Sequence, residues 1–137
     1  MAFEGPLEDR IAIRELIESY ADAVFQRDET AWAATWAEKS TWNLGGMEVE
    51  GRANIVALWR QAMAGFPFAA FVAMPGAIQV NGERATARVY ATEVLGLPDG
   101  KTRRIIGQYD DTLVKENGHW LFQRRAYQIL KDTTSET

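Results

Sequence analysis

Three polar residues, Tyr20, Glu93 and Arg125, have types and neighbours that could support chemistry beside apolar side chains. Tyr20 follows a helical apolar spacing, so its phenol could act as a weak acid or polarise a carbonyl group. Glu93 alternates with small apolar residues, where loss of water would raise its pKa and make it a base. Arg125 could bind a carboxylate or an enolate through its planar guanidinium.

Each of these residues also has a structural alternative. A core tyrosine can bond to the backbone, Glu93 can lie in water beyond the rim of a pocket, and Arg125 can pair with an acid on a helix. Strand periodicity leaves open whether Arg124 or Arg125 points inward, because both alternate with apolar and polar residues. Asp110 and Asp111 must face opposite sides of one strand, and we interpret both as charges near a turn or an interface.

The remaining residue types exclude several kinds of site. The chain has no cysteine and one histidine, His119, which follows a predicted hairpin turn. A metal site is therefore not expected. The sequence contains no glycine-rich phosphate loop or dinucleotide motif, and no Ser–His pair can be argued. We predict a site that needs neither a metal nor a cofactor.

The composition is that of one mildly acidic domain. Its 137 residues are 47% hydrophobic and 25% charged, which suffices for a single core. The net charge of −4 disfavours nucleic acid and anionic membranes. The N-terminus lacks the apolar run of a signal peptide, and no window approaches the ~20 apolar residues of a membrane span. We therefore expect a cytoplasmic protein that binds a small molecule, but neither nucleic acid nor a membrane.

The first half of the chain favours helices. Residues 7–27 repeat apolar side chains at the i, i+3, i+4, i+7 spacing of an amphipathic helix. A short second helix, capped by Asp28 or Thr30, is predicted to run through Trp36. A hairpin at 41–50 with a Gly-Gly turn and a third helix at 55–65 complete this half.

The second half favours strands. Four long strands are predicted at 69–80, 85–97, 102–115 and 120–130, joined by glycine-containing turns that pair neighbours as hairpins. The expected fold class is therefore α+β, with three N-terminal helices on the concave face of a strongly curved, mostly antiparallel sheet. The convex face would be left uncovered, so we expect a homodimer or homotrimer built on it.

This order of elements resembles the NTF2-like superfamily, and local sequence is most similar to its SnoaL-like branch. The similar segments cover nearly the whole chain: LEDRIAIRELIESYADAV, the run 28–42, IQVNGERA, GQYDDTLVKENGHW and FQRR. The resemblance implies one cone-shaped domain over residues 1–137, with an apolar pocket. Members of this family include cyclases, dehydratases, dehydrochlorinases and isomerases, as well as non-catalytic binding and assembly proteins, so the fold alone does not settle function.

The scytalone dehydratase and dehydrochlorinase branch implies an Asp–His pair that removes a proton from carbon. At the matching positions this chain has Phe25 and Phe71, and neither side chain can carry a proton. Two other features of the branch persist, since its polar pocket residue matches Tyr20 and its basic residue on the last strand matches Arg125. The usual chemistry of the branch therefore cannot operate unchanged.

Two functions remain open at this point. The first is a cofactor-independent lyase, dehydratase or isomerase for a small hydrophobic or aromatic substrate, with Tyr20 and Arg125 polarising an oxygen and Glu93 or water moving the proton. The second is a non-catalytic ligand-binding or assembly domain, which the loss of both dyad residues favours. The substrate-binding residues expected in either case are aromatic: Phe25, Trp42, Trp59, Phe71 and Tyr127.

Overall fold

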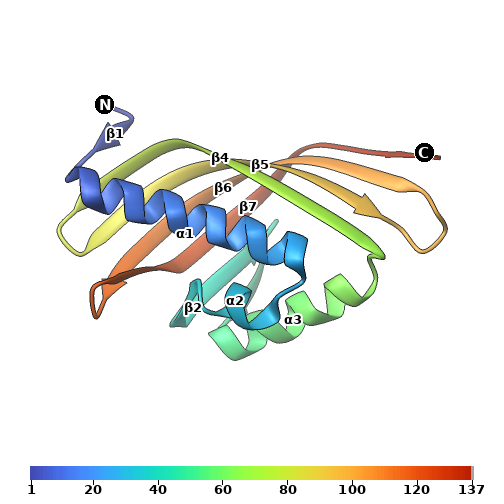
Figure 1. Ribbon diagram of the computed structural model, residues 1–137, viewed down its shortest axis with the longest axis horizontal. Helices are drawn as coiled ribbons and strands as arrows, with labels where there is room; N and C mark the ends of the chain where they lie inside the picture. Colours follow the sequence, from blue (N-terminus) through green and yellow to red (C-terminus); the bar gives the residue numbers. More distant parts are fainter. Residues whose placement is uncertain (137) are drawn as a thin grey trace.

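In the computed structural model, which describes residues 1–136, three helices lie on one side of a curved sheet (Figure 1). The seven strands have the order β1-β4-β5-β6-β7-β2-β3. The helices are α1 (Leu7–Gln26), α2 (Glu29–Ala33) and α3 (Arg52–Ala64). The strands are β1 (Phe3–Glu4), β2 (Trp36–Leu44), β3 (Met47–Glu50), β4 (Phe68–Asn81), β5 (Arg84–Gly96), β6 (Thr102–Glu116) and β7 (His119–Ser135). The predicted α+β architecture is confirmed.

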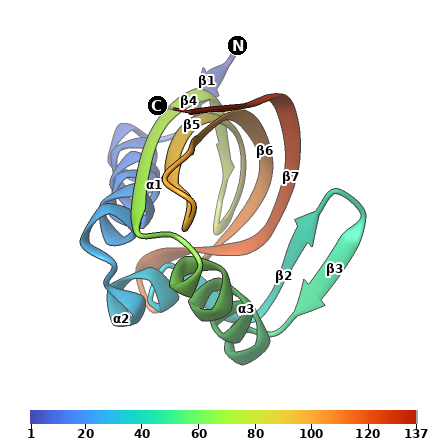
Figure 2. The same cartoon turned by 90° about the vertical axis from the view of Figure 1, so that its right-hand side faces the viewer.

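The four long strands form an antiparallel meander that curls around the helices, as the end-on view shows (Figure 2). Tight turns make this meander possible. Between β6 and β7, Asn117 and Gly118 have φ values of 51° and 78°, the positive φ pair that two-residue hairpin turns require. Two pairings in the sheet are parallel, that of β1 with β4 and that of β2 with β7, and the others are antiparallel.

The end of α1 and the start of α2 lie at the residues that the sequence predicts. Arg27 adopts a left-handed conformation with φ of 55° and closes α1. Asp28 then caps α2, since its side chain accepts a hydrogen bond of 3.0 Å from the Ala31 backbone nitrogen. The prediction that this helix runs through Trp36 is wrong. Trp36 instead begins β2 beside Phe122 of β7, because the Phe122 backbone N–H donates to the Thr35 carbonyl oxygen, and this pairing with β7 replaces a second helical turn.

The core lies between the helices and the concave face of the sheet. The inner side of α1 packs on β4 and reaches β7, burying Ile13, Ile17 and Tyr20. On the side of the core away from α1, tryptophan rings pack on one another. The rings of Trp32 and Trp59 stack there with their centroids 4.6 Å apart. No helix among residues 1–136 is long and apolar enough to cross a membrane.

Candidate functional site

The concave face of the sheet encloses a cavity with two adjoining chambers. The outer chamber has a volume of about 500 Å³ and lies between β5, β6, β7 and the end of α3. The inner chamber has a volume of about 110 Å³ and is walled by α1 and α3. Both chambers are lined by the same six residues where they meet: Trp42, Ala62, Phe66, Glu93, Leu95 and Tyr109. A ligand of moderate size could therefore occupy one chamber or extend through both.

Glu93 is the carboxylate at the junction of the chambers. It stands on β5 in alternation with the buried Ala91 and Leu95, so its side chain points into the cone as strand parity indicated. The hydroxyl of Tyr127 donates a hydrogen bond of 2.9 Å to its Oε2 atom. Burial raises the pKa of Glu93 above its ordinary value, while the Tyr127 hydrogen bond and the charge of Arg103 oppose the rise.

No cation of the described residues pairs directly with Glu93. Arg103, whose charge acts on Glu93, donates two hydrogen bonds of 3.0 and 2.6 Å to Asp132 on the neighbouring strand β7. The phenol of Tyr127 is thus the group that orients the carboxylate. Gly107 makes this possible, because a Cβ atom at this position would collide with the ring and hydroxyl of Tyr127. The missing side chain lets the Tyr127 ring lie flat across β6 toward β5.

Two further phenols, Tyr20 and Tyr109, line the inner chamber. Their ring centroids are 6.3 Å apart, with the rings arranged edge to face. Burial raises the pKa of Tyr20 to about 12 and raises that of Tyr109 well above its ordinary value. Both groups therefore stay protonated at neutral pH and can donate hydrogen bonds to an oxygen atom of a ligand.

The remaining walls are aromatic. Trp59 of α3 and Phe71 of β4 line the inner chamber, and Trp42 of β2 lines both chambers. Within residues 1–136 the indole Nε1 of Trp42 is buried without a hydrogen-bond partner. This nitrogen is inaccessible to solvent, so Trp42 lines the chambers with its ring carbons.

Arg125 was predicted to polarise a substrate oxygen, and the structure corrects this placement. Its guanidinium is buried behind the aromatic wall and lines neither chamber. It binds both carboxylate oxygens of Asp111, at 2.8 and 3.0 Å, and lies over the rings of Tyr109 and Phe122 at 3.8 and 4.1 Å. Asp111 of β6 therefore neutralises the charge of Arg125, for which the sequence analysis had expected a ligand as partner.

Phe25 was predicted to bind substrate, and the structure contradicts this prediction as well. Its side chain is 45% exposed and lines only a shallow depression between α1 and β4, outside the two chambers. Phe71 lies at the back of that depression but is buried and also faces the inner chamber. The two rings that replace the dyad of the family therefore share the outer depression, and only Phe71 reaches the inner chamber.

Sequence reasoning passed over Tyr109 and misread Asp111, although a signal for both was present. On β6 the residues Ile105, Tyr109 and Leu113 are all buried, and Asp111 has the same strand parity. Reading alternation across the whole strand would have placed Asp111 in the core and Tyr109 in the cavity wall. No group of three or more His, Cys, Asp or Glu side chains that could hold a metal ion occurs within the described part of the chain.

The sequence profile of the SnoaL-like domain matches residues 5–126, so the chain belongs to the SnoaL-like domain family. No curated protein matches it in sequence. The resemblance first seen in the order of the elements is thereby confirmed, and the cone around an apolar cavity is the fold that this family defines.

Solved structures share this fold over almost the whole chain. A protein of Novosphingobium aromaticivorans assigned as an aromatic ring hydroxylase superposes with a TM-score of 0.88 at 24% identity, covering 96% of each chain. Another protein of that organism, assigned as a scytalone dehydratase, gives 0.86 at 21% identity, covering 93% of this chain and 87% of that one. A hexachlorocyclohexane dehydrochlorinase of type 2 gives 0.86 at 16% identity, with coverages of 94% and 90%. The fold is therefore the NTF2-like cone of dehydratase and dehydrochlorinase relatives.

Proposed function

We propose that this protein is a cofactor-independent lyase or isomerase that removes a proton from a carbon atom of a small hydrophobic or aromatic substrate. Glu93 is the general base in this proposal. The observation that carries it is the position of one carboxylate at the junction of two apolar chambers, where a phenol orients it and no cation neutralises it. A carboxylate in this setting is a stronger base than one in water.

The proposed step begins with the substrate ring between the aromatic walls, as the apolar lining of both chambers supports. Glu93 takes a proton from a carbon next to a carbonyl group, and the electron pair of the broken C–H bond moves onto the carbonyl oxygen as an enolate. In an isomerase the same carboxyl group returns the proton to another carbon. In a lyase the electron pair returns to expel a leaving group from the adjacent carbon.

The enolate oxygen needs hydrogen-bond donors that are already in place, because such donors stabilise the charge that develops in the transition state. Tyr20 and Tyr109 offer phenolic donors in the inner chamber. These two residues take the role that the sequence had assigned to Tyr20 with Arg125.

Proton exchange on a model ketone tests the proposal without knowledge of the natural substrate. We would follow the exchange of the acidic C–H hydrogens of 2-tetralone in D₂O by NMR, with binding measured separately by tryptophan fluorescence. Wild-type protein is expected to accelerate the exchange, and Glu93→Gln to lose about 10²–10⁴-fold of the acceleration while still binding the ketone. Glu15→Gln, an exposed change on α1, is the matched control and should leave both readouts unchanged.

A non-catalytic binding domain is the second candidate, and the absence of an acid or base at positions 25 and 71 favours it. In that case 2-tetralone would quench the fluorescence of the cavity tryptophans, but wild type and Glu93→Gln would exchange its hydrogens equally slowly. That result would refute the proposed catalytic role and leave the cavity as a ligand store.

A further inference from the structure

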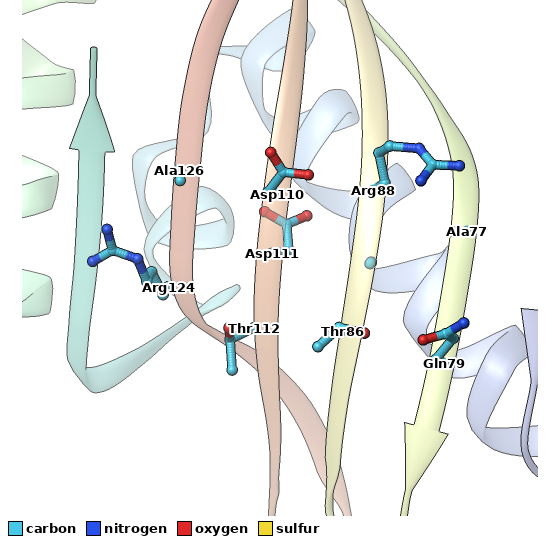
Figure 3. A pocket seen from close by; sticks show the side chains of 10 residues that line it. Ala77, Gln79, Thr86, Arg88, Asp110, Asp111, Thr112, Arg124 and Ala126 are labelled. Carbon is cyan, nitrogen blue, oxygen red and sulfur yellow. The ribbon is translucent and has the colours of Figure 1, made fainter. Parts of the chain in front are cut away.

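β4 is an edge strand over most of its length, and α1 runs alongside it (Figures 1 and 2). On its outer side β4 pairs with β1 alone, at Ile78 and Gln79, within residues 1–136. Figure 3 shows β4, with Ala77 and Gln79, as the outermost of the four long strands. The edge of a sheet presents backbone N–H and C=O groups that have no partner strand, so the part of β4 before Ala77 can receive one more strand.

The depression between α1 and β4 lies along this open edge. It has a volume of about 270 Å³ and is lined by residues 71–73 of β4 together with Glu18, Asp22 and Phe25 of α1. We call it the β4 edge groove. Its walls are partly apolar, since the side chains of Phe25 and Val72 are 45% and 61% exposed. The groove therefore offers room for a chain segment beside an unpaired strand and a helix, the setting in which extended peptides add to a sheet.

Two carboxylates, those of Glu18 and Asp22, line the helix side of the β4 edge groove. Both side chains are exposed, and neither forms an ion pair with any other residue of 1–136. Four residues separate them, which is about 6 Å along a helix axis. Side chains on the same face of a strand repeat every two residues, or about 6.6 Å. Basic side chains at alternate positions of an added strand could therefore each meet one of the two carboxylates.

The other face of the β4 edge is apolar and has a definite end. Val72 and Met74 share strand parity there and are 61% and 60% exposed. Pro75 follows and has no N–H to offer, and a β-bulge lies between Pro75 and Ala77. Prolines and bulges of this kind limit pairing at sheet edges. The stretch that can receive a strand is thus about 68–74, with carboxylates on one face and apolar side chains on the other.

We propose that the β4 edge groove binds an extended peptide segment of another protein, in which basic and apolar residues alternate, as an added strand on β4. Its basic side chains pair with Glu18 and Asp22, its apolar side chains pack beside Val72 and Met74, and its backbone pairs with the edge. A second copy of this chain lacks this complementarity, because pairing β4 with β4 would bring like carboxylates together. The groove lies outside the two chambers, so the proposal does not depend on the function of the cavity.

Fluorescence anisotropy with a labelled hexapeptide of alternating lysine and valine tests the proposal. Wild type is expected to bind the peptide saturably in a one-to-one complex. The double variant Glu18→Gln with Asp22→Asn should raise the Kd about 10-fold, because it removes both ion pairs. The matched control is Glu83→Gln with Glu116→Gln, which removes the same charge from exposed positions at two hairpin ends and should leave the Kd unchanged. Circular dichroism would check that each variant is folded.

Modified peptides test the backbone pairing while the protein stays unaltered. Alternate N–H groups of a strand point to the same side, so methylating either the lysine or the valine nitrogens removes every donor on one side. One of these two peptides should bind at least about 10-fold more weakly than the unmodified peptide. The proposal would be overturned by a lack of saturable binding, by equal Kd values for all three peptides, or by an unchanged Kd in the Glu18→Gln, Asp22→Asn variant. A peptide that binds only by separating two copies of the chain in sedimentation would assign the edge to a second copy and would also overturn it.

Discussion

Two carboxylates on neighbouring strands of the same concave face, one buried and one half-buried, have opposite surroundings. Asp111 on β6 is fully enclosed and is bound through both oxygens by Arg125, which itself lies between aromatic rings. Glu93 on β5 faces open volume and receives one hydrogen bond, from Tyr127. The Asp111–Arg125 ion pair therefore closes one end of the cone, whereas the other end contains the chamber that Glu93 lines.

The difference teaches that the counter-group, and not burial alone, separates a structural carboxylate from a reactive one. Burial raises the pKa of both Asp111 and Glu93, and a positive charge opposes the rise in each case. At Asp111 that charge is in direct contact, and two hydrogen bonds join the carboxylate to the guanidinium. At Glu93 the charge of Arg103 is shared with Asp132, and the carboxylate keeps free lone pairs toward the cavity.

The largest expected effect comes from breaking the closed end. Asp111→Ala should lower the free energy of unfolding by about 3–5 kcal/mol, because it leaves the Arg125 charge buried without a partner. The double variant Asp111→Leu with Arg125→Met removes both charges and should recover most of that loss. Urea unfolding of the two variants gives the comparison. Equal losses of unfolding free energy in the single and the double variant would show that the Asp111–Arg125 pair is not what closes this end of the cone.

A smaller effect is expected from filling the space that lets Tyr127 reach Glu93. Gly107→Ala should push the Tyr127 ring away from β6 and lower the free energy of unfolding by about 1–3 kcal/mol through overpacking. Tyr127→Phe is the matched variant, since it removes the same hydrogen bond without the steric clash. In both variants the pKa of Glu93, measured by NMR of its side-chain carbon, should rise because the bond that lowers it is gone. An unchanged pKa in both would contradict the role of Tyr127.

The pH dependence of stability should show the cost of ionising Glu93 at the open end of the cone. Because the pKa of Glu93 is raised in the folded state, ionising it costs stability as the pH rises through and above its ordinary value of 4.5. Below that pH the group is protonated in both folded and unfolded chains and contributes nothing. Glu93→Gln should therefore raise the Tm at pH 8, and the gain should disappear toward pH 4. A Tm that falls at pH 8 would mean that the ionised carboxylate is stabilised by partners other than Tyr127.

The smallest effect is expected at the dyad position that lies outside both regions. Phe25→Ser changes an exposed ring on α1, so the free energy of unfolding should shift by no more than about 0.5 kcal/mol. Binding of 2-tetralone should be unchanged in the fluorescence titration. The buried Phe71 offers the contrast, since Phe71→Ala should cost about 3–5 kcal/mol. A loss of ligand binding in Phe25→Ser would show that Phe25 belongs to the binding site after all.

Local patterns in the sequence predict the fold class, the meander and the inward face of β5. Helical spacing and glycine turns are local properties, and they placed α1, α3 and the four long strands close to their observed ends, except that β7 continues to Ser135. Alternation on β5 likewise brought Glu93 into the cone, because its neighbours at every second position are small and apolar.

Only the tertiary structure decided the partners of these residues. Arg125 and Asp111 meet because β6 and β7 pair in one particular register, which shifts at an irregularity next to Thr112, and no local pattern specifies such a shift. The place of Trp36 depends on its parallel pairing with β7. Periodicity fixes which residues share a face, whereas the contact across that face is set by packing between elements far apart in the chain.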